Sequence, residues 1–199
     1  MPMDVLERVD FALFEVINGL AGQSNALDKF LSILASDYLI PVGMGLILYF
    51  SWFDSGNIEQ RGYKQRIVVA SITHMAIASL SILLINQLFF RERPFTANEV
   101  TLIFYAPTDS SFPSNTAAGT LGIALPFIFS RTKSTGLILI GMSFTFSLAR
   151  VYVGVHYPGD IIGGYLASLL TFPVSITILK VFRPLQDKVL KTMRAFALA

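Results

Sequence analysis

The sequence contains no cysteine, only two histidines and few charged side chains. The absence of cysteine excludes a disulfide framework, thiolate zinc sites, iron–sulfur clusters and a cysteine nucleophile. Charged residues make up 14% of the 199 residues, against about a quarter in a typical globular chain, whereas hydrophobic residues make up 53%. Because the apolar residues come in long runs, this composition argues against a free-standing soluble domain.

Five apolar runs predict membrane-spanning helices. A helix needs about 20 mostly apolar residues to cross a hydrocarbon core of about 30 Å, and the runs reach or approach that length. They cover residues 30–53, 67–90, 116–130, 136–155 and 161–182, the third being shorter and rich in glycine. We therefore predict an all-α, polytopic membrane helix bundle of about five transmembrane helices, with the two chain ends on opposite sides.

The segments that flank these runs are more polar. Within residues 1–27, apolar side chains alternate with charges such as Glu7, Asp10 and Glu15, which would be costly in hydrocarbon. This pattern predicts an N-terminal amphipathic helix at the membrane interface and is unlike a signal peptide, which needs a basic start and an unbroken apolar core. Residues 183–199 are predicted to form a basic tail. The chain, 1–199, is thus expected to be one membrane-embedded domain with its transmembrane core at 28–182.

Lysine and arginine positions near the ends of the runs set the expected orientation. Ten of these residues fall on one face: Arg61, Lys64, Arg66, Arg131, Lys133, Lys180, Arg183, Lys188, Lys191 and Arg194. Five fall on the other face: Arg8, Lys29, Arg91, Arg93 and Arg150. The first face is therefore predicted to be cytoplasmic, and the second to face the periplasm or the cell exterior.

Most of the side chains that are suited to chemistry lie in three segments of that outer face, at 86–98, 110–118 and 149–162. They include Arg91, Arg93 and Arg150, on the side where positive charge is disfavoured. Because a guanidinium group matches phosphate oxygens with two parallel hydrogen bonds, these arginines indicate an anion site, most simply for phosphate.

Pro113, Ser114 and Asn115, followed by small residues, are typical of the start of a helix. The free N–H groups at such a start can bind an anion. Taken alone, Ser114 is better explained as a simple helix cap. The three nearby arginines shift the balance toward an anion site.

His156 is followed four residues later by Asp160. A histidine becomes a better nucleophile when a carboxylate accepts a hydrogen bond from its other ring nitrogen. Asp160 is equally suited to cap the fifth span, and its two oxygens allow both roles. Pro158 and Gly159 predict a turn between the two side chains. The other histidine, His74, falls within the second span, where we expect a polar contact between helices.

Three motifs carry a family resemblance: R-E-R-P at 91–94, P-S-N-T at 113–116, and an arginine, a histidine and an aspartate at 150, 156 and 160. Their order and spacing resemble the three-part signature of the type 2 phosphatidic acid phosphatase family. Segments 86–95 and 112–115 look most like the bacterial undecaprenyl diphosphate phosphatase branch of that family. The resemblance covers roughly residues 86–160.

This resemblance implies a helical membrane enzyme that removes phosphate from a lipid without a metal or another cofactor. His156 would attack phosphorus to form a phosphohistidine, and Asp160 would orient it. Arg93, Ser114 and Arg150 would hold the phosphoryl oxygens, with Asn115 beside them. The implied substrate is undecaprenyl diphosphate, a lipid of cell wall biogenesis, at the outer face of the bacterial cytoplasmic membrane. The expected partners are this phosphorylated isoprenoid lipid and membrane lipids, with no nucleic acid, and the sequence makes no prediction of oligomeric state.

Four positions depart from the family pattern. Asn86 stands where the family has lysine, and Arg91 is the expected substitute for that charge. Asn115 and Ala149 replace a glycine and a serine, which are milder changes. The serious departure is Thr116, which stands where the family has the histidine that protonates the leaving oxygen.

Threonine has no proton to give near neutral pH, so its effect depends on the leaving group. A lipid alcohol, with a pKa of about 16, leaves poorly without an acid, whereas the lipid phosphate released from a diphosphate has a pKa of about 6 to 7. The sequence therefore fits either a weakened diphosphatase or a disabled variant, natural or engineered. The alternatives are a lipid monophosphatase of the phosphatidylglycerophosphate or phosphatidate type and a catalytically silent phospholipid-binding protein.

Overall fold

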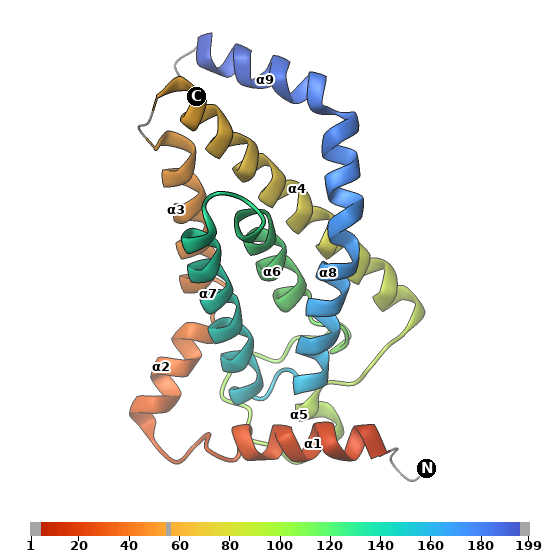
Figure 1. Cartoon of the computed structure of the whole chain (residues 1–199). Coiled ribbons are helices and arrows are strands. Elements are labelled where there is room, and N and C mark those ends of the chain that lie inside the picture. The colour runs from red at the N-terminus through yellow and green to blue at the C-terminus, as the bar shows by residue number, and fades with distance from the viewer. Residues whose placement is uncertain (1–4, 55–56, 196–199) are drawn as a thin grey trace.

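The computed structural model describes residues 5–54 and 57–195, and every regular element among them is a helix (Figure 1). Four helices form the bundle: α4 (Ile58–Leu88), α6 (Asn115–Ile128), α7 (Lys133–Tyr152) and α8 (Pro158–Val181). α6 is the central helix and packs against the other three. The predicted all-α helix bundle is confirmed.

Small and apolar side chains let the other helices close around α6. This helix buries ten of its 14 residues, and Phe127 joins Met44 of α3 (Leu39–Phe53) in the main apolar cluster. On α8, a Cβ atom at Gly164 would lie 2.3 Å from the carbonyl oxygen of Ser114. Only glycine allows this approach, which brings the start of α8 against the start of α6.

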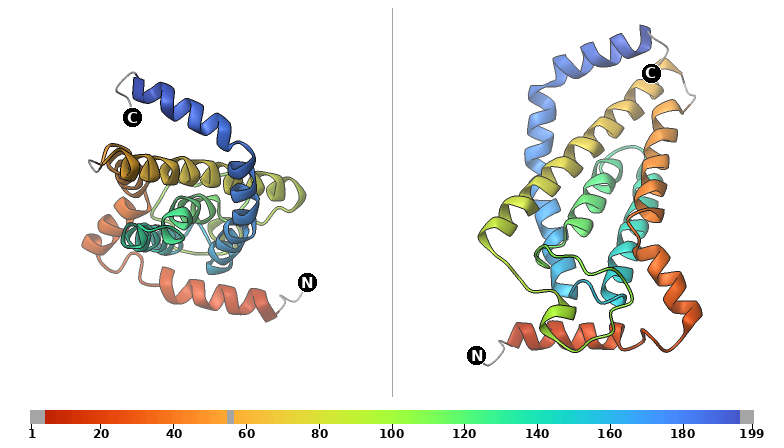
Figure 2. Two further views of the ribbon diagram at one scale, coloured as in Figure 1. Left: turned by 45° about the horizontal axis from the view of Figure 1, so that its top comes forward. Right: turned by 180° about the vertical axis from the view of Figure 1, so that it is seen from behind.

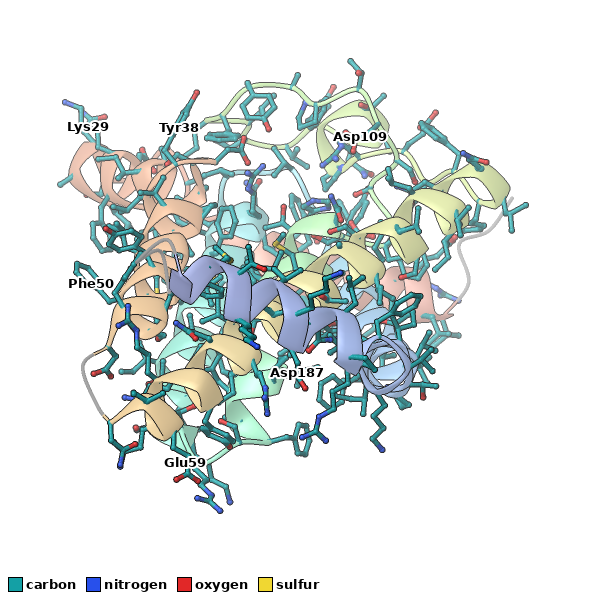
Figure 3. All side chains as sticks on the ribbon, turned by 90° about the horizontal axis from the view of Figure 1, so that it is seen from above. Lys29, Tyr38, Phe50, Glu59, Asp109 and Asp187 are labelled. Atoms are coloured by element: carbon teal, nitrogen blue, oxygen red, sulfur yellow. The ribbon has the colours of Figure 1, made fainter. Side chains whose placement is uncertain are left out.

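Large apolar side chains cover the outside of the bundle. Leu88 is 90% exposed and Leu170 is 76% exposed, and Phe50 points away from the neighbouring helices (Figure 3). An exposed surface of this kind suits contact with lipid rather than with water. Among the described residues, α4, α7 and α8 are each long and apolar enough to cross a membrane.

Two of the predicted spans differ from continuous membrane-crossing helices. α6 has 14 residues, which gives a length of about 21 Å, less than a hydrocarbon core. The first predicted span, 30–53, is divided into α2 (Asn25–Ala35) and α3, which are bent by 46°. Pro41 explains the break, because proline has no N–H for a continuous helix and is tolerated in a first helical turn. The described part of the chain therefore provides three clear spans, or four if α2 and α3 form one bent span.

Helices also occupy both ends of the bundle (Figure 2). At one end lie α1 (Val5–Asn18) and the short α5 (Pro94–Ala97); at the other lies α9 (Arg183–Ala195). α1 covers only part of the predicted 1–27 segment, and it buries Phe14 while leaving Leu6 and Val16 exposed. Within the segment predicted as a basic tail, 183–199, the structure forms the helix α9, which buries Leu190. Residues 1–4 and 196–199 of these two segments lie outside the described residues.

Candidate active site

The three outer-face segments identified in the sequence meet at the end of the bundle that carries α1 (Figure 1). They enclose a pocket of about 120 Å³. Six of the predicted site residues line it: Asn86, Arg93, Asn115, Thr116, Arg150 and His156. The lining also includes residues that were not among the predicted site residues, notably Asp37, Tyr105 and Asp109.

His156 lies in the short connection between α7 and α8 and is 4% exposed. Its Nε2 atom lies 3.3 Å from Ser114 Oγ and 3.5 Å from Arg93 Nη1. Its Nδ1 atom lies 3.5 Å from Asp160 Oδ2. One ring nitrogen therefore faces the polar groups of the pocket, and the other faces a carboxylate.

Burial lowers the pKa of His156 below its usual range, although the neighbouring Asp160 carboxylate acts in the opposite direction. The positive charges of Arg93 and Arg150 add to the lowering of this pKa. The imidazole is therefore neutral near neutral pH. Neutral imidazole has the free lone pair that nucleophilic attack requires.

Asp160 is fully buried at the start of α8. Its Oδ2 accepts hydrogen bonds from Ser111 Oγ at 2.5 Å and from the Tyr157 N–H at 2.8 Å. Its Oδ1 accepts a hydrogen bond from Arg91 at 2.7 Å. Because the Tyr157 bond caps α8, the same carboxylate begins a helix and faces His156 Nδ1, so the two roles considered from the sequence are compatible in space.

Ser114 is the N-cap of α6, and its Oγ accepts a hydrogen bond from the Ala117 N–H at 3.4 Å. The same oxygen contacts His156 Nε2. Asn115 and Thr116, the first two residues of α6, line the pocket. The start of α6, with its free N–H groups and the positive end of its dipole, therefore lies at the pocket and favours a bound anion.

Arg93 and Arg150 are almost completely buried, with 6% and 3% of their surface exposed. Arg93 donates hydrogen bonds to the Val155 carbonyl at 2.7 Å and to the Asp109 carboxylate at 2.9 Å. Arg150 donates to Asp37, and its Nε atom is buried without a hydrogen-bond partner among the described residues. Buried donors without partners are rare, so this spare capacity indicates an anionic ligand.

The carboxylates of Asp37 and Asp109 were missed from the sequence. Asp37 lies at the break between α2 and α3, where its second oxygen accepts a hydrogen bond from Tyr105 at 2.9 Å. The side chains of Asp37 and Asp109 are 53% and 68% exposed, although each is paired with a buried arginine. Asp37 fell inside an expected unbroken span, and Pro41 was the signal that could have revealed the break.

Asn86 and Arg91, expected to share one role, lie in different places. Asn86 lines the pocket, and its Oδ1 atom is buried without a hydrogen-bond partner among the described residues. Arg91 instead donates one hydrogen bond to Asp160 and one to Asp10, each at 2.7 Å. Because both branches of its guanidinium group are already bound away from the pocket, this geometry does not favour the phosphate contact expected of Arg91.

The second histidine lies away from this site. His74 is fully buried on α4, and its Nε2 atom lies 3.4 Å from Ser168 Oγ on α8. The predicted polar contact between helices is confirmed.

Comparison with known proteins agrees with this arrangement. The sequence profile of the PAP2 superfamily matches residues 67–183, more than half of the chain. The chain belongs to the PAP2 superfamily. This PAP2 protein is 30% identical over 188 residues to undecaprenyl-diphosphatase BcrC of Bacillus subtilis, a match that covers 94% of this chain and 93% of the relative. It is 26% identical to the putative undecaprenyl-diphosphatase YbjG of Escherichia coli, over 83% of this chain and 80% of that protein.

Solved structures show the same PAP2 fold. Aquifex aeolicus LpxE superposes with a TM-score of 0.66 and 24% identity, covering 85% of this chain and 95% of that chain. A PAP2-type phosphatidylglycerolphosphate phosphatase from Bacillus subtilis superposes with a TM-score of 0.59 and 19% identity, over 90% of this chain and 88% of that chain. With its apolar spans, the protein is an integral membrane protein of the PAP2 phosphatase family of hydrolases.

Proposed function

We propose that this PAP2 phosphatase removes the terminal phosphate of undecaprenyl diphosphate through a phosphohistidine on His156. The observation that carries the proposal is the convergence of Ser114 and two buried arginines on the pocket side of His156. The substrate is supported by the similarity to BcrC and YbjG, which are both named for this activity.

In the proposed reaction, His156 Nε2 attacks the terminal phosphorus. The bond from phosphorus to the bridging oxygen breaks, and its electron pair stays on the lipid phosphate. Arg93, Arg150 and the start of α6 stabilise the charge that spreads over the phosphoryl oxygens. Asp160 stabilises the cationic ring that forms. Water then attacks phosphorus, the N–P bond breaks with its electron pair returning to Nε2, and the water proton passes to solvent.

Thr116 favours a diphosphate over a monophosphate. The first step leaves charge on the departing oxygen, and threonine supplies no proton to it. A lipid phosphate tolerates this charge, whereas a lipid alkoxide does not. We therefore favour slow diphosphatase activity over a lipid monophosphatase. Thr116 also favours a second candidate, a phospholipid-binding protein in which the arginines hold the phosphate and no bond is broken.

We further propose that the pocket faces the outside of the bacterial cytoplasmic membrane and that α9 lies on the cytoplasmic side. The support is the distribution of charge. The end of the bundle that carries α9 also holds Arg61, Lys64 and Lys133, near the starts of α4 and α7, so more lysine and arginine gathers there than at the pocket end. An excess of lysine and arginine is typical of the cytoplasmic side.

Phosphate release in detergent tests the chemistry, with undecaprenyl diphosphate and a phosphatidate as substrates and His156→Ala as the matched variant. We expect slow turnover of the diphosphate, at least about tenfold slower turnover of the monophosphate, and none with His156→Ala. Equal rates in the two proteins would overturn the nucleophile. Lipid binding without release in either would support the second candidate.

The same assay in sealed membranes tests the orientation. A water-soluble, short-chain diphosphate added to right-side-out vesicles should be hydrolysed without detergent. A rate that appears only after detergent opens the vesicles would overturn the outward placement of the pocket.

A further inference from the structure

Arg91 is held on the side of Asp160 that faces away from the pocket. Its guanidinium group donates to Asp160 Oδ1 at 2.7 Å and lies 4.0 Å above the ring of Tyr157. Its backbone is also fixed, because its N–H donates to Ser110 Oγ and its carbonyl accepts from the N–H of Ser111. Ser111 itself donates to Asp160. Arg91 and the segment that binds Asp160 therefore form one unit.

Asp10 completes this unit from the interfacial helix α1. Its Oδ2 accepts the second Arg91 hydrogen bond at 2.7 Å, and its Oδ1 accepts the Gly159 N–H at 2.6 Å. A Cβ atom at Gly159 would lie 2.7 Å from Asp10 Oδ2, so a side chain there would displace the carboxylate. α1 is thus joined to the first turn of α8, one residue before Asp160.

In this network the two oxygens of Asp160 have different partners. The side chain of Asp160 is 0% exposed, that of Asp10 is 14% exposed and that of Arg91 is 24% exposed. A buried carboxylate without a cation is strongly destabilising, and Arg91 supplies the cation at Oδ1. Because Arg91 is bound at Oδ1 and shared with Asp10, the other oxygen of Asp160, Oδ2, is left facing His156 Nδ1 at 3.5 Å.

We propose that Arg91 and Asp10 are positioning residues, which hold Asp160 so that Oδ2 faces His156 and which couple the interfacial helix α1 to the nucleophile. The proposal rests on the proposed roles of His156 and Asp160. It assigns Arg91 to the orientation of the nucleophile rather than to substrate phosphate, and these two roles predict different kinetics.

Kinetics of the full chain in detergent separate these roles, using Arg91→Gln, Arg91→Lys and Asp10→Asn. Asparagine can still accept the Gly159 hydrogen bond, so Asp10→Asn removes the charge and the hydrogen-bond acceptor that face Arg91. Arg66→Gln is the matched control, because Arg66 makes a 2.8 Å ion pair with Asp187 on α9, the helix at the end of the bundle opposite α1 (Figure 1).

We expect Arg91→Gln to lower kcat about 10- to 100-fold, the range typical of losing a group that orients a metal-binding histidine. KM and the inhibition constant for orthophosphate should stay unchanged. Arg91→Lys should recover part of kcat, and Asp10→Asn should have a smaller effect that disappears in the Arg91→Gln background. An unchanged kcat overturns the proposal, and so does a joint rise of KM and the orthophosphate constant, which would place Arg91 on the substrate. A fall in kcat that merely follows the loss of folded protein also overturns it.

A wild-type protein without any turnover would contradict the proposed function but would leave the positioning role undecided by kinetics. A second measurement tests the positioning role in that case. The chain has only two histidines, so nitrogen-15 labelling of histidine gives signals from His156 and His74 alone, and His156→Gln assigns them. We expect Arg91→Gln to shift the Nδ1 signal of His156 and to leave that of His74 in place. Identical His156 signals in wild type and Arg91→Gln would overturn the positioning role.

Discussion

Arginine–aspartate ion pairs lie on both sides of His156, but they differ in how deeply the aspartate is buried. On the pocket side, buried Arg93 and Arg150 are paired with the exposed carboxylates of Asp109 and Asp37. On the opposite side, Arg91 is paired with a fully buried carboxylate and a nearly buried one. The exposure of the carboxylate is therefore what separates an arginine that can exchange partners from an arginine that is fixed.

The energies of ion pairs explain this difference. A pair between exposed groups typically contributes about 0–1 kcal/mol. Because the carboxylates of Asp37 and Asp109 stay in contact with solvent, a phosphate with more charge and more oxygens can displace them. Breaking a buried pair typically costs about 3–5 kcal/mol, and substrate binding on the far side of His156 offers nothing to offset it. The pocket side is suited to binding and release, and the Asp160 side to holding a geometry.

The largest effect should come from the buried side, through Asp160→Asn. Asparagine can keep the cap of α8 but supplies no charge to His156, so we expect kcat to fall about 10³- to 10⁴-fold, as in related changes to histidine–carboxylate pairs, with little change in KM. Burial lowers the pKa of His156 and Asp160 raises it. The acid limb of kcat/KM should therefore lie below the usual range of histidine in the wild type and move lower still in Asp160→Asn.

Thermal unfolding and pH profiles of kcat/KM provide the check for this variant. An acid limb that stays in place, or moves to higher pH, would contradict the pairing of Asp160 with His156. A change in KM alone would mean that Asp160 serves substrate binding rather than the orientation of His156.

A gain of activity is expected on the pocket side from Thr116→His. The new imidazole would lie at the start of α6, in the pocket lining, where it can protonate the leaving oxygen. General acid catalysis typically contributes about 10²- to 10⁴-fold. We expect at least about a tenfold rise in phosphate release, larger for a lipid monophosphate than for a diphosphate. Thr116→Gln, which fills the site without a titratable proton, is the control, and equal rates for the two variants would show that this position does not serve the general acid.

The sequence was sufficient to predict that the site residues converge, because helices that alternate in direction bring every second connection to the same end of a bundle. The residues after α4, before α6 and between α7 and α8 meet for that reason. The direction of a side chain in an irregular segment has no such periodicity. Arg91 and Arg93 are two positions apart, yet one binds Asp160 and the other faces the pocket. The position of Asp37 at the pocket depends on the break between α2 and α3, which apolar composition alone does not reveal.

The smallest effect is expected from Asp109→Asn. This change affects only the pocket side, where the carboxylates paired with the arginines are exposed. Asp109 accepts a hydrogen bond from Arg93 Nη2, so a phosphate must compete with it. Removing the carboxylate charge should strengthen the binding of orthophosphate by about 1.5- to 5-fold, the range that corresponds to about 0.2–1 kcal/mol for a solvated carboxylate. Asp37→Asn should do the same through Arg150, and Asp187→Asn, in the distant pair with Arg66, should not. Inhibition of turnover by orthophosphate measures this change. Weaker inhibition in Asp109→Asn would mean that the carboxylate orients Arg93 rather than competing with phosphate for it. The arginines on the two sides of His156 would then not differ in the way argued above.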